Sequence, residues 1–116
     1  MHNFRELKIW QKSRILVKEI YKISYKFPPH EQFGLTSQIQ RAVVSIPTNI
    51  AEGSGRGTNK DFARFLDIAI SSGFEIETDV ILAYDLEYIT ENDLNESITK
   101  IQEVQKMIFA FRNSLK

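Results

Sequence analysis

Apolar residues recur every three or four positions along most of the chain, which is the pattern of helices that bury one face. This spacing predicts four helices, over residues 3–27, 32–52, 58–88 and 90–115. No stretch alternates with the period of two that a half-buried strand requires. The three connections are short, and short connections favour antiparallel neighbours. The sequence therefore predicts an all-α fold, an antiparallel up-down-up-down four-helix bundle, with residues 1–116 forming a single domain.

Capping residues and prolines set the expected helix ends. Asn3, with Glu6 three residues later, is the expected cap of the first helix, and Pro28 ends that helix. Thr58 and Thr90 are each followed three residues later by an aspartate, so both are expected to open a helix with a capping box.

The third predicted helix carries two apolar stripes, so it should contact more than its neighbours in sequence. The first stripe has heptad spacing and comprises Phe62, Leu66, Ala69, Gly73, Ile76, Val80 and Ala83. The second comprises Phe65, Ile70, Phe74, Ile81, Tyr84 and Tyr88. The chain also holds eight Phe, four Tyr and one Trp, more apolar surface than a slim bundle core can bury. Surplus apolar surface predicts self-association, that is, a homo-oligomer.

Pro47 falls inside the second predicted helix. A proline there lacks the N–H donor and crowds the carbonyl four residues earlier, so we expect a kink near residues 43–46. Ser45 and Thr48 flank it and are candidates to bond the freed backbone groups. The polar residues nearby satisfy such groups or form a buried network at a subunit boundary. The candidates for structural or subunit contacts are Gln38, Pro47, Asn49, Glu52 and Gly53.

A glycine-rich loop, residues 53–57, follows this helix and precedes the third. One interpretation is a helix C-cap and turn, in which glycines supply positive φ angles. The other is an anion contact, because backbone N–H groups, a helix N-terminus, Arg56 and Lys60 all favour negative charge there. The spacing excludes a Walker-type phosphate loop.

The charges are balanced overall but unevenly distributed. Residues 1–27 hold seven Lys or Arg against two Asp or Glu, whereas residues 61–116 hold five against eleven. Either the basic helix packs beside an acidic one, or it offers a basic face to an anionic polymer. There is no cysteine, no apolar run of membrane-spanning length and no signal-peptide pattern at the start, so we expect a cytoplasmic protein with no membrane contact.

Catalytic and metal-binding patterns are weak. A di-iron bundle needs Glu-x-x-His on two helices, but the histidines are His2 and His30, and neither completes that motif. Glu75 and Asp79 lie four apart on one helical face, where they form an acid–base pair, a solvated face or a partner for lysines. We favour the structural alternatives, and we predict no enzymatic activity, no cofactor and no metal.

Two runs and a later set of positions resemble a known family. The first run reads Phe33-Gly34-Leu35-Thr36-Ser37-Gln38, and the second reads Ser45-Ile46-Pro47-Thr48-Asn49-Ile50-Ala51-Glu52-Gly53. With Phe4, Leu7 and Trp10 before them and Glu75-Ile76-Glu77-Thr78 after them, they extend over nearly the whole chain. The chain resembles bacterial four-helix-bundle proteins encoded within intervening sequences of large-subunit ribosomal RNA genes, many of which are called S23 ribosomal proteins. That family is similar to the accessory variability determinant proteins of diversity-generating retroelements.

This resemblance implies a homopentameric barrel of four-helix protomers with a role in nucleic-acid binding. We therefore predict electrostatic binding of RNA or DNA through phosphates. The candidate binding residues are Lys8, Lys12, Lys18, Lys22, Lys26, Arg41, Arg56 and Lys60. The alternative is a scaffold whose acidic segments dock a basic protein partner.

Overall fold

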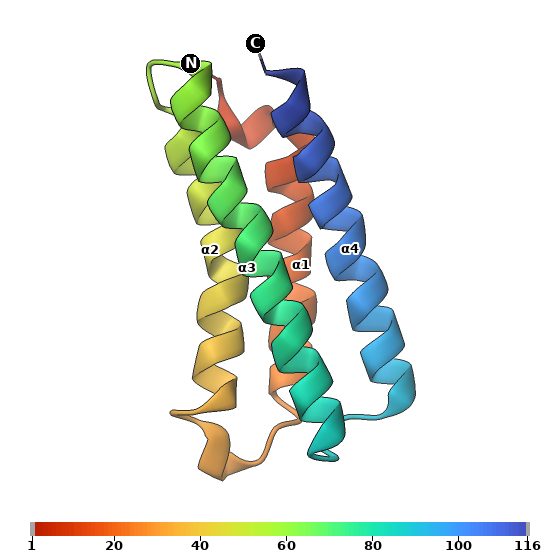
Figure 1. Ribbon diagram of the computed structural model, residues 1–116. Helices are drawn as coiled ribbons and strands as arrows, with labels where there is room; N and C mark the ends of the chain where they lie inside the picture. Colours follow the sequence, from red (N-terminus) through yellow and green to blue (C-terminus); the bar gives the residue numbers. More distant parts are fainter. Residues whose placement is uncertain (1, 116) are drawn as a thin grey trace.

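The computed structural model describes residues 2–115 and confirms the all-α bundle. Its helices are α1 (Lys8–Ser24), α2 (Leu35–Ser54), α3 (Asn59–Asp85) and α4 (Glu91–Ser114). Two short 3₁₀ turns, η1 (Phe4–Glu6) and η2 (Pro29–Glu31), precede α1 and α2. The helices run alternately up and down along a body of 44 × 24 × 19 Å (Figure 1).

Each helix packs against two others in a square arrangement. α2 contacts α1 and α3, and α4 contacts α3 and α1. The first residues of the chain lie beside the end of α2, where the backbone N–H of His2 donates to the carbonyl of Ser54 at 3.1 Å. One end of the bundle therefore carries the start of α1, the α2–α3 loop and the end of α4 (Figure 1).

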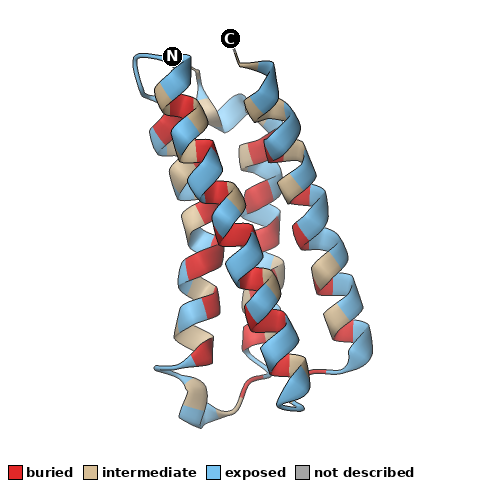
Figure 2. Ribbon diagram, viewed as in Figure 1, coloured by how far each residue is buried: buried red, intermediate tan, exposed pale blue. Residues whose placement is uncertain are grey.

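The core follows the apolar periodicity. Buried residues form bands on the inner sides of the helices (Figure 2). All seven members of the heptad stripe on α3 are buried. Phe74 and Ile81, from its second stripe, remain exposed. Within residues 2–115, no helix combines the length and apolar character needed to cross a membrane.

Several predicted helix ends need correction. Asn3 caps only η1, its Oδ1 accepting from the N–H of Arg5, and α1 begins at Lys8. The second helix begins at Leu35 rather than at residue 32, and the separate turn η2 (Pro29–Glu31) lies just before the predicted start. Thr58 caps α3 through the N–H of Asp61. At the start of α4 both halves of the predicted capping box are present.

α2 runs unbroken through Pro47. The side chains that flank Pro47 do bond backbone carbonyls. The carbonyls they bond are not that of Val43, which is the group that Pro47 leaves without its usual donor. Ser45 Oγ donates to Ala42, Thr48 Oγ1 donates to Val44, and Asn49 Nδ2 donates to Ser45. These bonds accompany the helix on both sides of the proline and explain the polar residues around it.

The glycines of the α2–α3 loop do not supply positive φ angles, so that expectation is wrong. Gly53 is buried inside α2, and a Cβ there would lie 2.7 Å from the Cβ of Phe65. Close approach of α3 therefore explains this glycine. Among the described residues only Glu87 has a positive φ, of 66°. It ends α3 in a Schellman motif, with the N–H of Tyr88 bonded to the carbonyl of Ala83.

Candidate nucleic-acid interface

The eight predicted basic residues are all exposed, but they occupy separate parts of the surface. Lys12, Lys22 and Lys26 line shallow grooves between α1 and α4. Arg41 lies on α2, where it lines one groove against α3 and another against α1. The remaining positions are Lys8 at the start of α1, Lys18 on its exposed face, and Arg56 and Lys60 near the α2–α3 loop.

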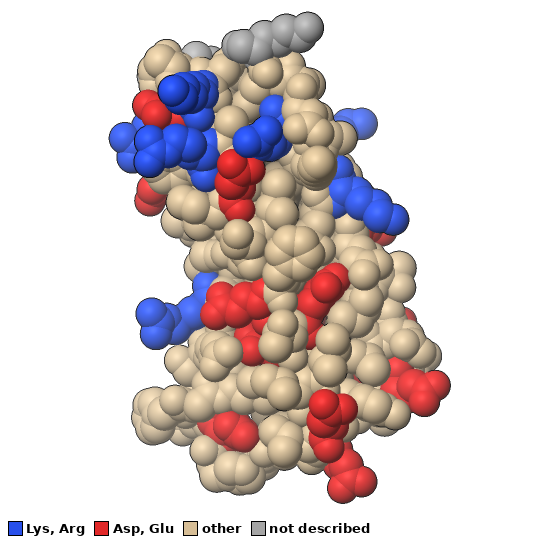
Figure 3. Space-filling view, in the orientation of Figure 1, with Lys and Arg blue, Asp and Glu red and all other residues tan. Residues whose placement is uncertain are grey.

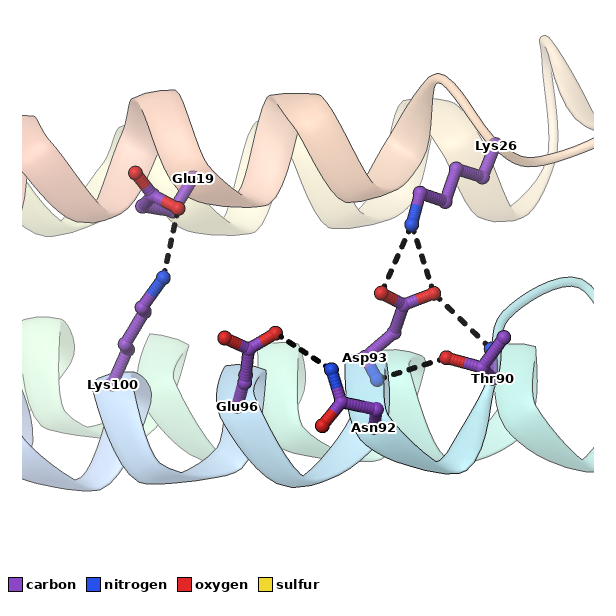
Figure 4. Close-up of polar contacts among 7 residues, drawn as sticks. All are labelled: Glu19, Lys26, Thr90, Asn92, Asp93, Glu96 and Lys100. Carbon is purple, nitrogen blue, oxygen red and sulfur yellow. Dashed lines mark hydrogen bonds and ion pairs between the residues drawn. The ribbon is translucent and has the colours of Figure 1, made fainter.

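Two ion pairs join α1 and the residues just after it to α4, and one of them neutralises a predicted basic residue, Lys26. Lys26 Nζ lies 2.9 Å from Asp93 Oδ1, and Lys100 Nζ lies 2.9 Å from Glu19 Oε2 (Figure 4). The hydrogen bond from Lys26 lowers the pKa of Asp93, and the bond from Lys100 lowers the pKa of Glu19. Of the ion pairs within residues 2–115, only Lys26–Asp93 joins a cation of the basic segment to an anion of the acidic one. Complementary packing therefore accounts for a small part of the uneven charge, and Lys8, Lys12 and Lys18 still face solvent.

A second group of cations lies at the end of the bundle that carries the α2–α3 loop. Arg56 lies on that loop, and Lys60 and Arg64 follow one turn apart at the start of α3. The chain start, held beside Ser54, brings Arg5 and Lys8 to the same end. On the face in Figure 3, Lys and Arg gather toward this end, whereas Asp and Glu dominate the other half. We call Arg5, Lys8, Arg56, Lys60 and Arg64 the basic end.

Aromatic rings support the arginines at this end. The guanidinium carbon of Arg56 lies 4.6 Å from the ring centroid of Phe65, and that of Arg5 lies 5.5 Å from the centroid of Phe4. Such cation–π contacts hold a guanidinium near the surface while its N–H donors remain open to solvent. Asp61 is one acidic neighbour, 3.9 Å from Arg64 in an exposed pair that contributes little, and Glu6 follows Arg5 in η1.

Asp79 is neither solvated nor paired with a lysine, so this part of the prediction is wrong. The residue is wholly buried between α3 and α2, where Gln38 Nε2 donates to its Oδ1 at 2.8 Å. Two turns along the same seam between α2 and α3, the hydroxyl groups of Ser45 and Ser72 are hydrogen-bonded to each other. Burial, with a smaller contribution from the charge of Glu75, raises the pKa of Asp79 to about 6.

The predicted structural residues of α2 divide between two surfaces. Gln38 faces α3, and Gly53 packs against Phe62 and Phe65. Pro47 and Glu52 line an open, mainly apolar groove against α1, of about 510 Å³. Trp10, Val17 and Val44 complete much of its wall. This groove is a surface on which another apolar group can pack, as the surplus of apolar residues predicts.

The acidic positions on α3 do not assemble a catalytic centre or a metal centre. Residues 2–115 contain no group of three His, Asp or Glu side chains placed to hold a metal ion. Glu75 is exposed, while Asp79, four residues on, is buried with its amide partner. The pair therefore does not present two carboxylates to one open cleft, which acid–base chemistry on a substrate requires.

Sequence reasoning missed Arg5 and Arg64 as members of the basic end. Arg64 follows Lys60 by four residues, so helical spacing was a usable signal that both lie on one face. For Arg5 no local signal exists, because its place depends on how the chain start folds back beside Ser54.

A known protein family matches most of the chain. A family model described as "23S rRNA-intervening sequence protein" matches residues 5–110. The chain belongs to this family. The match includes all four helices except the last turn of α4. A search of curated proteins gave no match.

A solved structure of this family shares the fold. It is a protein from Bacteroides thetaiotaomicron, described as having unknown function and as belonging to the S23 ribosomal protein family. The two are 26% identical, with a TM-score of 0.80, and the match covers 91% of this chain and 99% of the other. The resemblance to the S23 type is thereby confirmed, and the fold extends over the whole of that relative.

Proposed function

We propose that this protein is a non-enzymatic, cytoplasmic, self-associating helical bundle that binds RNA or DNA through phosphate contacts. The observation that carries the proposal is the basic end, where the elements that carry Arg5, Lys8, Arg56, Lys60 and Arg64 meet on a chain with no net charge. Phosphate contacts from such side chains supply most of the affinity of sequence-independent binding. The description of the family, which refers to an intervening sequence of 23S ribosomal RNA, supports the same class of partner.

Fluorescence anisotropy at several salt concentrations tests this proposal. The purified protein is titrated against a labelled RNA hairpin and a labelled DNA duplex. We expect the logarithm of the binding constant to fall linearly with the logarithm of salt, by about 0.9 for each duplex phosphate neutralised. Absence of binding at about 50 mM salt, where such contacts are strong, refutes the proposal.

Two matched triple variants locate the interface. The first, Arg56→Gln/Lys60→Gln/Arg64→Gln, removes three charges from the basic end. The second, Lys18→Gln/Lys22→Gln/Arg41→Gln, removes three exposed charges elsewhere. The first should weaken binding and flatten the salt dependence by up to about three units of slope, and the second should have a small effect. The reverse order would place the interface along α1 and α2 instead.

Self-association rests on a different surface. The groove between α1 and α2 is lined by Trp10, Val17, Val44, Pro47 and Ala51, and we propose that a second copy packs on it. The family resemblance implies five copies. Sedimentation velocity gives the mass of the assembly. Val44→Glu places a charge in this groove and should reduce the mass, whereas Lys18→Glu on the exposed face should not. A monomeric wild-type protein refutes this part of the proposal.

A further inference from the structure

A second groove lies between α2 and α3 and is strongly polar. Its volume is about 530 Å³, and it is lined mainly by Ser37, Gln38, Arg41, Ser45 and Glu75. It is separate from the basic end. Gln38 lies near the start of α2, at the opposite end of the bundle, and Glu75 lies past the middle of α3 toward that same end. The basic end therefore does not account for the polar side chains of this groove.

One residue of this groove, Gln38, contacts the buried carboxylate of Asp79. Gln38, which lines the groove, donates its Nε2 to Asp79 Oδ1 at 2.8 Å. The other oxygen, Oδ2, is buried and has no hydrogen-bond partner among residues 2–115. Carboxylate oxygens buried in this way normally accept several donors or face a cation.

The electrostatics of the site favour an incoming positive charge. Burial, together with the charge of Glu75, raises the pKa of Asp79 to about 6, so the buried carboxylate is mostly ionised at neutral pH. The charged neighbour of Asp79 on α3 is Glu75. On α2, the groove is lined by Gln38, which is neutral, and by Arg41, which is exposed. An ionised carboxylate with one neutral donor is poorly compensated, and a cation beside it would stabilise it.

We propose that this groove is a docking site for an arginine side chain of a basic partner protein. Its guanidinium pairs with the exposed carboxylate of Glu75 and, once the side chain of Gln38 turns aside, with the buried carboxylate of Asp79. A guanidinium offers five N–H donors in a plane and is more weakly hydrated than an ammonium, so it suits a site where one carboxylate is exposed and a second is buried behind an amide. A metal ion fits less well, because no third carboxylate or histidine lies with these two among residues 2–115. The proposal is independent of the nucleic-acid interface, which uses other residues.

Arg41 is the competing cation of the chain itself. It lines the same groove as Glu75 and is exposed. Its charge repels an incoming guanidinium, or screens Glu75 from it. Arg41→Gln should therefore strengthen docking of an arginine, whereas its effect on nucleic-acid binding at the basic end should be small.

NMR titration of the full-length protein tests the proposal. The probe is the peptide acetyl-Gly-Arg-Gly-amide, and its matched control carries citrulline, a neutral relative of arginine, in place of the arginine. We expect the arginine peptide to shift the signals of the Gln38 side-chain amide. We also expect it to lower the titration midpoint of the Asp79 carboxyl carbon by about one unit, as an adjacent opposite charge does. The citrulline peptide should leave both unchanged.

Three variants make the result specific. Asp79→Asn should abolish the shift of the Gln38 amide, and Glu75→Gln should weaken it several-fold. Glu91→Gln, an exposed carboxylate on α4, should have no effect. Should Asp79→Asn fail to fold, Glu75→Gln and the midpoint of Asp79 in the wild type decide the question.

Several outcomes would overturn the proposal. They are an Asp79 midpoint unmoved by the arginine peptide at tens of millimolar, an equal response to the citrulline peptide, and an unchanged response in Asp79→Asn. An equal or larger shift with magnesium chloride alone would also overturn it, because the groove would then be a metal site.

Discussion

Replacing Asp79 by asparagine should stabilise the fold at neutral pH and leave its stability nearly unchanged near pH 4. The side chain has no exposed surface, and its bonded partner is the neutral amide of Gln38, at 2.8 Å. Asparagine has almost the same size and keeps a carbonyl oxygen that can accept this bond. The substitution therefore removes little except the ability of the residue to carry a charge.

The magnitude follows from the pKa of Asp79, which rises from 3.8 to about 6 in the folded protein. Between these two values the folded state binds more protons than the unfolded state. The free energy of unfolding therefore falls as the pH rises through this window, and it is constant above it. Each pKa unit is worth about 1.4 kcal/mol, so the full effect above pH 6 is about 3 kcal/mol. Asparagine avoids this loss.

Urea denaturation followed by circular dichroism at pH 4, 5, 6, 7 and 8 measures the effect. The free energy of unfolding of the wild type is subtracted from that of the variant. This cancels the contributions of Asp93, Glu19 and Glu31, whose lowered pKa values make stability fall as the pH decreases. The difference should grow from near zero at pH 4 to about 3 kcal/mol at pH 7. Glu91→Gln serves as an exposed control. A difference independent of pH, or a variant less stable at pH 7, would refute the reasoning.

Three further changes test the ends of the helices. Glu87→Gly should stabilise the protein by about 1 kcal/mol in the same urea assay, because glycine adopts the positive φ of 66° without strain. The control Glu87→Gln, which removes only the charge, should raise the free energy of unfolding by less. Thr90→Ala should lower stability by about 1 kcal/mol, since it removes the cap of α4, and an unchanged midpoint would contradict the capping geometry. Lys26→Met should cost up to about 1 kcal/mol at pH 7. Lys26 lowers the pKa of Asp93, so that loss should disappear as the pH falls below the unfolded value of 3.8, and a loss that persists at pH 2 would count against the pairing.

The bundle could be predicted from the sequence because each helix buries one face. The stripe from Phe62 to Ala83 keeps heptad spacing, and every member of it is buried. The helix ends were predicted less well, because short 3₁₀ turns and helix starts share the same capping residues. Asn3, for example, accepts the N–H of Arg5 as an N-cap would, yet the helix begins five residues later at Lys8.

The candidate site was harder to predict, because it depends on which segments meet. Lys60 and Arg56 could be found from the loop, but Arg5 joins them only through the packing of the chain start. Asp79 was predicted to lie on a solvated face or to pair with lysines, because charged residues are seldom wholly buried. Its partner, Gln38, is 41 residues away. A weak signal was present, since Ser72 lies seven residues before Asp79 and Ser45 seven after Gln38, so two polar pairs repeat along one helix seam.

The two proposed interfaces should respond differently to salt, and this difference separates them. Phosphate contacts at the basic end are exposed, so counterions compete with them directly and binding should weaken steeply between 50 and 200 mM salt, about the range over which such contacts lose most of their strength. The pairing of an arginine with Asp79 takes place behind Gln38, in a partly buried groove where screening is weaker. A partner that survives moderate salt and is lost in Asp79→Asn belongs to the groove. A partner that salt removes, and that Arg56→Gln/Lys60→Gln/Arg64→Gln weakens, belongs to the basic end.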